Sequence, residues 1–226
     1  MIELQHIHKS FGPHDVLKDV SAQFEQGKVN FVIGRSGSGK SVMTKCTVGL
    51  IEPDRGQVIY DGRDFTAMTE RERREIRQEI GMLFQGSALF DSMTVEENVQ
   101  FPLRMFSDLS TAEIARRSAA CLERVELLDA QQRYPAECSG GMQKRVGIAR
   151  AIAMNPKYLF CDEPNSGLDP QTAIVIDKLI LDLTREYGMT TVVVSHDMNS
   201  VMEASDTIHF VHEGGICWKG DRVGLL

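Results

Sequence analysis

Residues 29–41 read VNFVIGRSGSGKS: a mostly apolar run, Val29–Ile33, is followed by a segment rich in glycine and serine and then by Lys40 and Ser41. Glycines let successive backbone N–H groups turn inward around an anion, and a helix starting at about Lys40 adds the positive end of its dipole. The segment matches the phosphate-binding pattern G-x-x-x-x-G-K-[ST] in full. We therefore expect Lys40 to contact the β- and γ-phosphates of a nucleotide and Ser41 to bind Mg²⁺. The loop that would surround the phosphates consists of Gly34, Arg35, Ser36, Gly37, Ser38 and Gly39.

Short strands separated by glycine turns are predicted around this loop, and an acidic strand follows much later. The expected strands are Ile2–His8, Val20–Glu25, Val29–Ile33, Gln57–Tyr60, Ile80–Phe84, Tyr158–Asp162, Thr190–Ser195 and Thr207–His212. Between Gly86 and Pro156 we predict helices only. Residue pairs Thr69/Glu72 and Ser110/Glu113 have the spacing of capping boxes, and Asp169 with Pro170 would open a further helix.

The apolar strand Tyr158–Asp162 ends in two carboxylates, Asp162 and Glu163. A buried strand of an open α/β sheet points its carboxyl end toward the phosphate site. Asp162 would hold Mg²⁺, as the second acidic element of phosphate-loop enzymes does, and Glu163 would orient or deprotonate the attacking water. Without the phosphate loop, a solvated acidic strand end would explain the pair equally well.

A second anion-binding feature is predicted at the start of the helix that runs to about Met154. A serine and two glycines at a helix start leave N–H groups exposed, although an N-cap serine before a loose turn gives the same pattern. The segment consists of Ser139, Gly140, Gly141, Met142 and Gln143.

Composition and charge restrict the possible functions. The net charge of −7 argues against a general nucleic-acid-binding protein, which needs a basic face. No stretch reaches the roughly 20 apolar residues of a spanning helix, and the N-terminus lacks the apolar middle of a signal peptide. The five cysteines are scattered without metal-site spacing, so we expect reduced thiols in a cytoplasmic protein.

Taken together, these segments resemble the nucleotide-binding subunit of ABC transporters over essentially the whole chain. Further matches are Gln85 to the glutamine loop, Ser139–Gln143 to the signature, residues 166–169 (SGLD, ending in Asp169) to the D-loop, His196 to the switch histidine and Phe11 to the aromatic that stacks on adenine. Each residue also has an ordinary alternative: Phe11 could be a core aromatic, Gln85 a polar strand end, Asp169 an N-cap and His196 a structural histidine. Cys138 and Asn165 depart from the family's usual leucine and threonine.

The resemblance implies one α/β domain, 1–226, with a P-loop NTPase (RecA-like) core and an N-terminal antiparallel β subdomain formed by 1–85 and 157–226. A helical signature subdomain, 86–156, would be inserted. It further implies an ATPase that binds ATP and Mg²⁺, with Ser41, Gln85 and Asp162 as metal ligands. Glu163, His196, Gln85 and Lys40 would act in hydrolysis. In a homodimer, Ser139 and Gly141 would contact the γ-phosphate bound to the other subunit.

The resemblance also implies an integral membrane permease, so the protein would lie on the cytoplasmic face of the bacterial inner membrane. The segment 82–95 and Met142 are similar to ATPases of bacterial lipid transporters that work with mammalian-cell-entry-type proteins. On this basis we expect phospholipid transport between the two membranes. Alternatives are an ABC ATPase for another membrane substrate, a soluble non-transport ABC ATPase, or a non-catalytic nucleotide sensor.

Overall fold

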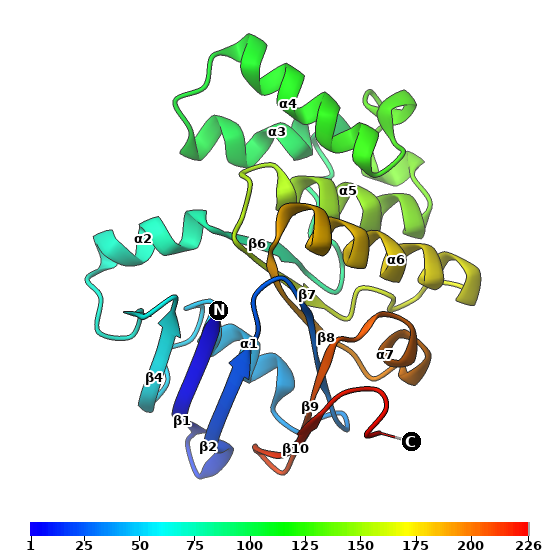
Figure 1. Cartoon of the computed structure of the whole chain (residues 1–226). Helices are drawn as coiled ribbons and strands as arrows, with labels where there is room; N and C mark the ends of the chain where they lie inside the picture. Colours follow the sequence, from blue (N-terminus) through cyan, green and yellow to red (C-terminus); the bar gives the residue numbers. More distant parts are fainter. Residues whose placement is uncertain (226) are drawn as a thin grey trace.

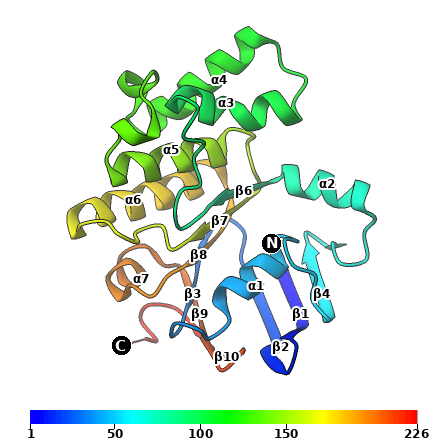
Figure 2. The same ribbon diagram turned by 180° about the vertical axis from the view of Figure 1, so that it is seen from behind.

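The computed structural model describes residues 1–225 and contains two sheets and a group of helices. Figures 1 and 2 show the strands β1, β2 and β4 at one end of the molecule and the helices α3 and α4 at the other. The strands β6 and β7 and the helices α5 and α6 lie between them, and β9 and β10 lie at the end that carries β2. This arrangement is the expected α/β nucleotide-binding core with an antiparallel sheet and a helical part.

The antiparallel sheet has the strand order β2-β1-β4-β5. Its strands are β1 (Ile2–Phe11), β2 (His14–Phe24), β4 (Arg55–Tyr60) and β5 (Arg63–Asp64). The prediction that its second strand begins at Val20 was wrong, because β2 pairs with β1 from the connecting turn onward, with Asp15 opposite Ser10 and Leu17 opposite Lys9. Backbone pairing thus keeps a mainly polar segment in the sheet.

The six-stranded sheet forms the centre of the molecule and has the order β10-β9-β3-β8-β7-β6. Its strands are β3 (Val29–Ile33), β6 (Ile80–Leu83), β7 (Tyr158–Asp162), β8 (Thr190–Val194), β9 (Thr207–His212) and β10 (Gly215–Gly220). All neighbours pair in parallel except β9 and β10. Every residue of β3 and β8 is buried, as expected for parallel strands covered on both faces.

Two hydrophobic cores cover the two faces of this sheet. Because side chains alternate along a strand, Phe31 and Ile33 enter one core and Val32 enters the other. The core around Val32 lies against the antiparallel sheet and α1 (Lys40–Thr47). The core around Phe31 includes residues of α3 (Val95–Phe106), α4 (Thr111–Arg124), α5 (Gly140–Ile152) and α6 (Pro170–Tyr187).

The remaining helices are short. They are α2 (Glu70–Gln78), α7 (Met198–Ala204) and the 3₁₀ segments η1 (Leu128–Ala130) and η2 (Pro135–Glu137). Both predicted capping boxes are present, at Thr69/Glu72 and Ser110/Glu113. In the described part of the chain, all elements between residues 86 and 156 are helical.

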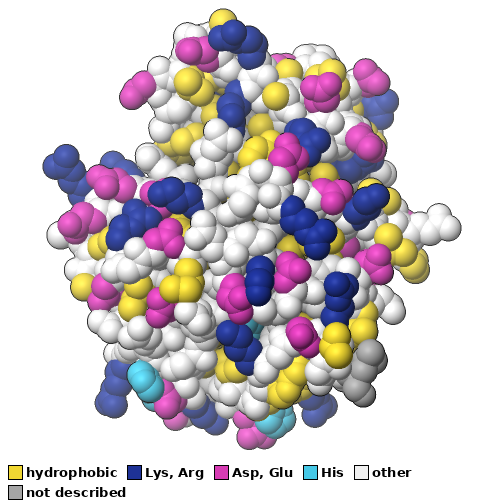
Figure 3. Space-filling model, viewed as in Figure 1, with side chains coloured by type: hydrophobic (Ala, Val, Ile, Leu, Met, Phe, Trp, Pro, Cys, Tyr) yellow, Lys and Arg dark blue, Asp and Glu magenta, His cyan; other side chains and the backbone are white. Residues whose placement is uncertain are grey.

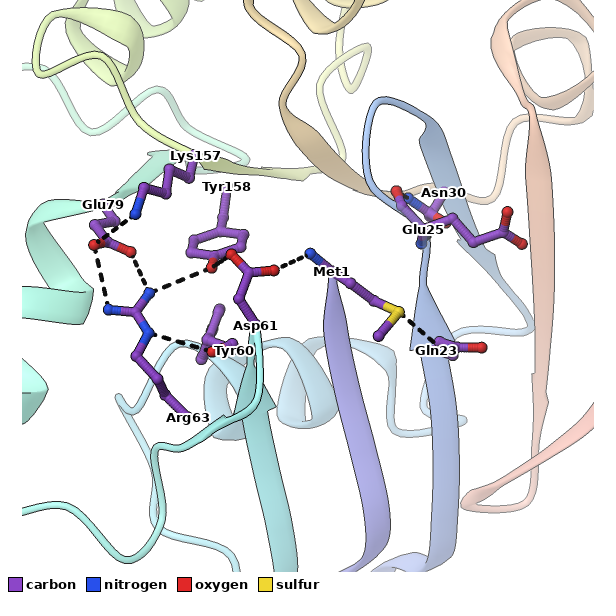
Figure 4. A network of polar contacts seen from close by, with 10 residues as sticks. All are labelled: Met1, Gln23, Glu25, Asn30, Tyr60, Asp61, Arg63, Glu79, Lys157 and Tyr158. Carbon is purple, nitrogen blue, oxygen red and sulfur yellow. Dashed lines mark hydrogen bonds and ion pairs between the residues drawn. The ribbon is translucent and has the colours of Figure 1, made fainter.

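A polar network connects the antiparallel sheet to the edge of the central sheet (Figure 4). The Tyr158 hydroxyl donates to Asp61 Oδ2 at 2.6 Å, and the Met1 amino group pairs with the same carboxylate. Nearby, Arg63 Nη2 donates to Glu79 Oε2 at 2.5 Å. Asp61 follows β4 and Arg63 begins β5, whereas Tyr158 begins β7 and Glu79 directly precedes β6. These contacts therefore fix the two sheets to each other.

The surface carries mixed charges. Figure 3 shows lysines and arginines interspersed with acidic side chains over the visible face. Among residues 1–225, no helix has the length and apolar character needed to cross a bilayer.

Candidate functional site

The phosphate loop lies between β3 and α1, where backbone conformation restricts its sequence. Gly34 has φ 151°, and a Cβ there would lie 2.2 Å from the carbonyl oxygen of Val211. Gly39 has φ 106°, and its Cβ would lie 2.9 Å from Leu17 Cδ2. A side chain at either position would displace the loop or the strand behind it. Gly34 and Gly39 are thus required by packing as well, whereas a Cβ on Gly37 would meet no atom within 4 Å.

A cavity of ≈ 580 Å³ opens above this loop. It is lined by Val16, Gly34, Arg35, Ser36, Gly37, Gly39, Lys40, Ser41, Val42, Gln85, Glu163 and His196. The structure therefore brings Gln85, Glu163 and His196, which are far apart in the sequence, to one site at the phosphate loop. A cavity of this volume is of the size that holds a small-molecule ligand.

Lys40 is 7% exposed, and its ammonium is held inside the loop. Nζ donates to the carbonyl oxygens of Gly34 at 2.8 Å and of Arg35 at 3.0 Å. These acceptors are neutral, so the positive charge stays available for an anion in the cavity. Because an ammonium interacts more strongly with a phosphate than with a carbonyl, a nucleotide could draw Nζ away from the loop.

Asp162 ends β7 directly before Glu163, and its oxygen Oδ1 is buried without a hydrogen-bond partner in the described structure. Burial raises the pKa of Asp162, and the neighbouring Glu163 carboxylate adds to this effect. A buried oxygen that lacks a partner is a good ligand for a hard cation, which prefers carboxylate and hydroxyl oxygens. Ser41 and Gln85 line the cavity, whereas Asp162 does not line it but directly precedes Glu163, which does. The three side chains offer the kind of oxygen ligands that Mg²⁺ prefers.

Glu163 and His196 form a pair at the wall of the cavity. His196 Nδ1 lies 2.8 Å from Glu163 Oε2, and the Glu163 side chain is 16% exposed. Glu163 has φ 49°, and its N–H donates to the Val194 carbonyl oxygen at 2.9 Å. A carboxylate held by an imidazole in this way can act as a proton acceptor for a water molecule.

Gln85 lies in the turn that follows β6 and has an exposed side chain. Its Nε2 donates to the Ser166 hydroxyl at 3.3 Å, which links the turn to the segment before α6. Its backbone carbonyl accepts a hydrogen bond from Lys144, a residue of α5 that lies outside every predicted motif.

The predicted signature segment lies at the start of α5 and is absent from the lining of the phosphate-loop cavity in residues 1–225. Ser139 caps the helix and accepts from the Met142 N–H at 3.3 Å. Gly140 is exposed and Gly141 half-buried, and a Cβ on Gly141 would lie 2.6 Å from Thr172 Cγ2. Gln143 instead donates to the Pro135 and Cys138 carbonyls, so it stabilises the turn before the helix.

Asp169 is the N-cap of α6, as the sequence predicts. Its Oδ1 accepts from the N–H groups of Gln171 at 3.1 Å and Thr172 at 3.0 Å. A hydrogen bond from the Thr172 hydroxyl is the main reason that the pKa of Asp169 is lowered.

Phe11, predicted to stack on adenine, is 47% exposed at the end of β1 and does not line the cavity in the described residues. Lys9 Nζ lies 5.6 Å from the centre of its ring. The alternative prediction, that Phe11 is a core aromatic, is wrong because nearly half of its surface is exposed. Val16 of β2 lines the cavity instead, and no feature of its sequence context would have identified it.

Comparison with known proteins matches residues 17–166 to the family model described as "ABC transporter". The methionine import ATP-binding protein MetN 1 of Pseudomonas putida is 41% identical over 224 residues, which cover 97% of this chain and 67% of that protein. The probable ribonucleotide transport ATP-binding protein mkl of Mycobacterium leprae is 37% identical over 225 residues, covering 100% of this chain and 65% of the relative. The chain thus spans about two thirds of the length of these relatives.

Solved structures share the fold over nearly the whole chain. The ATP-binding cassette MJ0796, in a dimeric post-hydrolysis state bound to ADP and Pi, has a TM-score of 0.89 at 33% identity and covers 98% of this chain and 99% of its own. The cbiO1 protein of Clostridium perfringens, part of the cbiONQ transporter complex, has a TM-score of 0.92 at 26% identity and covers 99% and 89%.

Proposed function

The chain belongs to the ATP-binding subunits of ABC transporters and is an ATPase, and from this premise we propose that it acts as a dimeric motor for a membrane permease. The observation that carries the proposal is the cavity in which the phosphate loop meets Gln85, Glu163 and His196. The nucleotide's phosphates bind the loop amides and Lys40, while Glu163, oriented by His196, accepts a proton from the attacking water.

Magnesium fits this site through Asp162, Ser41 and Gln85. When bound, the ion supplies charge stabilisation for the transferred phosphoryl group. The protein's own part is to hold these oxygen ligands beside the phosphate loop and to fix the Glu163 carboxylate.

Two copies of the chain complete each site. The start of α5, where Ser139 and Gly140 are exposed and Gly141 is half-buried, lies outside the cavity of its own subunit. An exposed helix start is suited to bind a phosphate, so the signature of one subunit would cover the nucleotide bound by the other. The dimeric state of MJ0796 with ADP and Pi supports this arrangement.

A groove on the helical side gives the permease a place to dock. It has a volume of ≈ 300 Å³ and is lined mainly by apolar residues of β6, of the segment 84–90 and of α3, with Arg150 and Ala151 of α5 at its side. Phe84, Phe90 and Phe106 lie in it, and they are 38%, 40% and 51% exposed. Exposed aromatic residues of this kind are suited to receive an apolar face of a short helix. With the permease bound there, the chain would lie against the cytoplasmic side of the membrane.

The comparisons do not support phospholipid as the substrate or a mammalian-cell-entry-type partner. The matched relatives are named for methionine import and for ribonucleotide transport. They favour a transporter for another substrate, for which methionine is the first candidate. Phospholipid remains the second candidate because of the sequence of residues 82–95 and Met142.

The substrate is tested by purifying the chain with the permease that it captures and reconstituting the complex in vesicles. Methionine import predicts ATP-dependent uptake of labelled methionine, with no transfer of a fluorescent phospholipid. Phospholipid transport predicts the reverse result. If the chain captures no membrane protein, and if its ATPase rate does not change when a permease is added, the motor function itself would be contradicted.

A further inference from the structure

Lys144 is a buried charge that none of the assigned motifs explains. It lies in the second turn of α5, and only 4% of its surface is exposed. Its Nζ donates to the backbone carbonyl of Gln85 and, at 3.3 Å, to that of Glu163. One side chain thus connects the helix that begins with the signature to the turn that follows β6 and to the end of β7.

The position is unfavourable for a lysine that only fills space. Burial lowers the pKa of Lys144, while Asp162 and Glu163 are among the groups that raise it. Removing an ammonium from water costs free energy unless its hydrogen bonds are replaced, and an apolar side chain of similar volume would avoid that cost. The two hydrogen bonds to backbone carbonyls are therefore what the lysine provides and an apolar side chain would not.

Glu163 needs such support because its backbone is strained. A φ of 49° is unfavourable for a residue with a side chain, because Cβ then crowds the following carbonyl oxygen. Its carbonyl accepts from the Ser166 N–H at 3.1 Å as well as from Lys144, and its N–H is bound to Val194. Of these contacts, the one from Lys144 comes from the signature helix.

We propose that Lys144 is a positioning residue that transmits the position of the signature helix α5 to the Glu163 backbone and to the Gln85 turn. When the start of α5 engages the nucleotide of the partner subunit, a shift of the helix moves Nζ and with it both carbonyls. The direction of the Glu163 carboxylate then depends on whether the partner's nucleotide is bound. This inference rests on the proposed role of Glu163 in hydrolysis.

The test is a double-mutant cycle with Lys144→Met and Glu163→Gln, measured by steady-state ATP hydrolysis. A small misplacement of a catalytic group costs roughly 10- to 100-fold in rate, so Lys144→Met should lower kcat by about that factor and change KM for ATP less than about twofold. In the Glu163→Gln background the same substitution should change kcat less than about twofold, because its effect passes through Glu163.

Arg145→Met is the matched control. Arg145 is the next residue of α5 and also donates to a backbone carbonyl, that of Val125 at 3.1 Å. It donates to neither the Gln85 carbonyl nor the Glu163 carbonyl. It should keep kcat near the parent value.

If Lys144→Met does not fold, Lys144→Leu, which also lacks a hydrogen-bond donor, takes its place in the cycle. Additive losses in the cycle, or an unchanged kcat in the single variant, would overturn the positioning role. By contrast, a Glu163→Gln protein that hydrolyses ATP at the parent rate would refute the proposed function instead.

Discussion

Replacing Glu163 by glutamine tests the assignment of the catalytic base. The side chain is 16% exposed and lies 2.8 Å from His196 Nδ1. Glutamine has the same number of heavy atoms, and its amide oxygen can accept the same hydrogen bond, so the free energy of unfolding should change by only about 1 kcal/mol. The amide cannot accept a proton from water. A general base contributes about 10²–10⁴ in rate, so the activation free energy should rise by roughly 3–5 kcal/mol.

Phosphate release measures the rate, calorimetry measures ATP affinity, and size-exclusion chromatography detects the dimer. We expect kcat to fall by about 10²–10⁴, ATP binding to remain, and ATP to trap the dimer because hydrolysis no longer releases it. Glu213→Gln is the control, since Glu213 also has a positive φ, 46°, but its side chain is 80% exposed on the turn between β9 and β10. Hydrolysis at the parent rate by Glu163→Gln would refute the assignment.

Three further predictions concern the loop, the groove and the core. Gly34→Ala places a Cβ 2.2 Å from a backbone oxygen and should abolish detectable ATP binding. Gly27→Ala, at φ 69° in open space, is the control and should still bind ATP. Equal affinities of the two variants in a fluorescent-nucleotide titration would contradict the loop geometry. Phe106→Ser should reduce co-purification of the permease without lowering ATPase activity of the isolated subunit, and full recovery of the complex would argue against docking at the groove. Burial lowers the pKa of His209 to about 4 from 6.5, so the unfolded state gains a proton first as the pH falls. Through His209, the free energy of unfolding should therefore drop by about 3 kcal/mol between pH 7 and pH 4. Urea unfolding of His209→Leu should show a pH-dependent decrease that is smaller by this amount.

Local patterns were enough to predict the features whose chemistry is contained in a few neighbouring residues. The phosphate loop, the capping boxes and the Asp169 N-cap depend on backbone geometry over three to eight residues, so their spacing in the sequence specifies them. The parallel strands were also predictable, because burial on both faces gives continuous apolar runs such as Val29–Ile33.

Features that depend on distant partners were not predictable from such patterns. Strand β10, Gly215–Gly220, contains two glycines and forms by pairing with β9 at the sheet edge. Val16 and Lys144 contact the site only because β2 and α5 bring them there. The relation between the signature and the phosphate loop was predicted from family resemblance, since in one chain these segments line no common cavity within residues 1–225.

The central claim is that the loop amides, Lys40 and a metal-bound hydroxyl hold the phosphates of ATP. Titration calorimetry of the parent protein and of Lys40→Ala with ATP and Mg²⁺ tests it most directly. Because a charge-assisted hydrogen bond contributes about 1.5–3 kcal/mol, the Kd for ATP should rise roughly 10- to 150-fold in the variant. No heat of binding in the parent protein, or the same Kd in both proteins, would contradict the account.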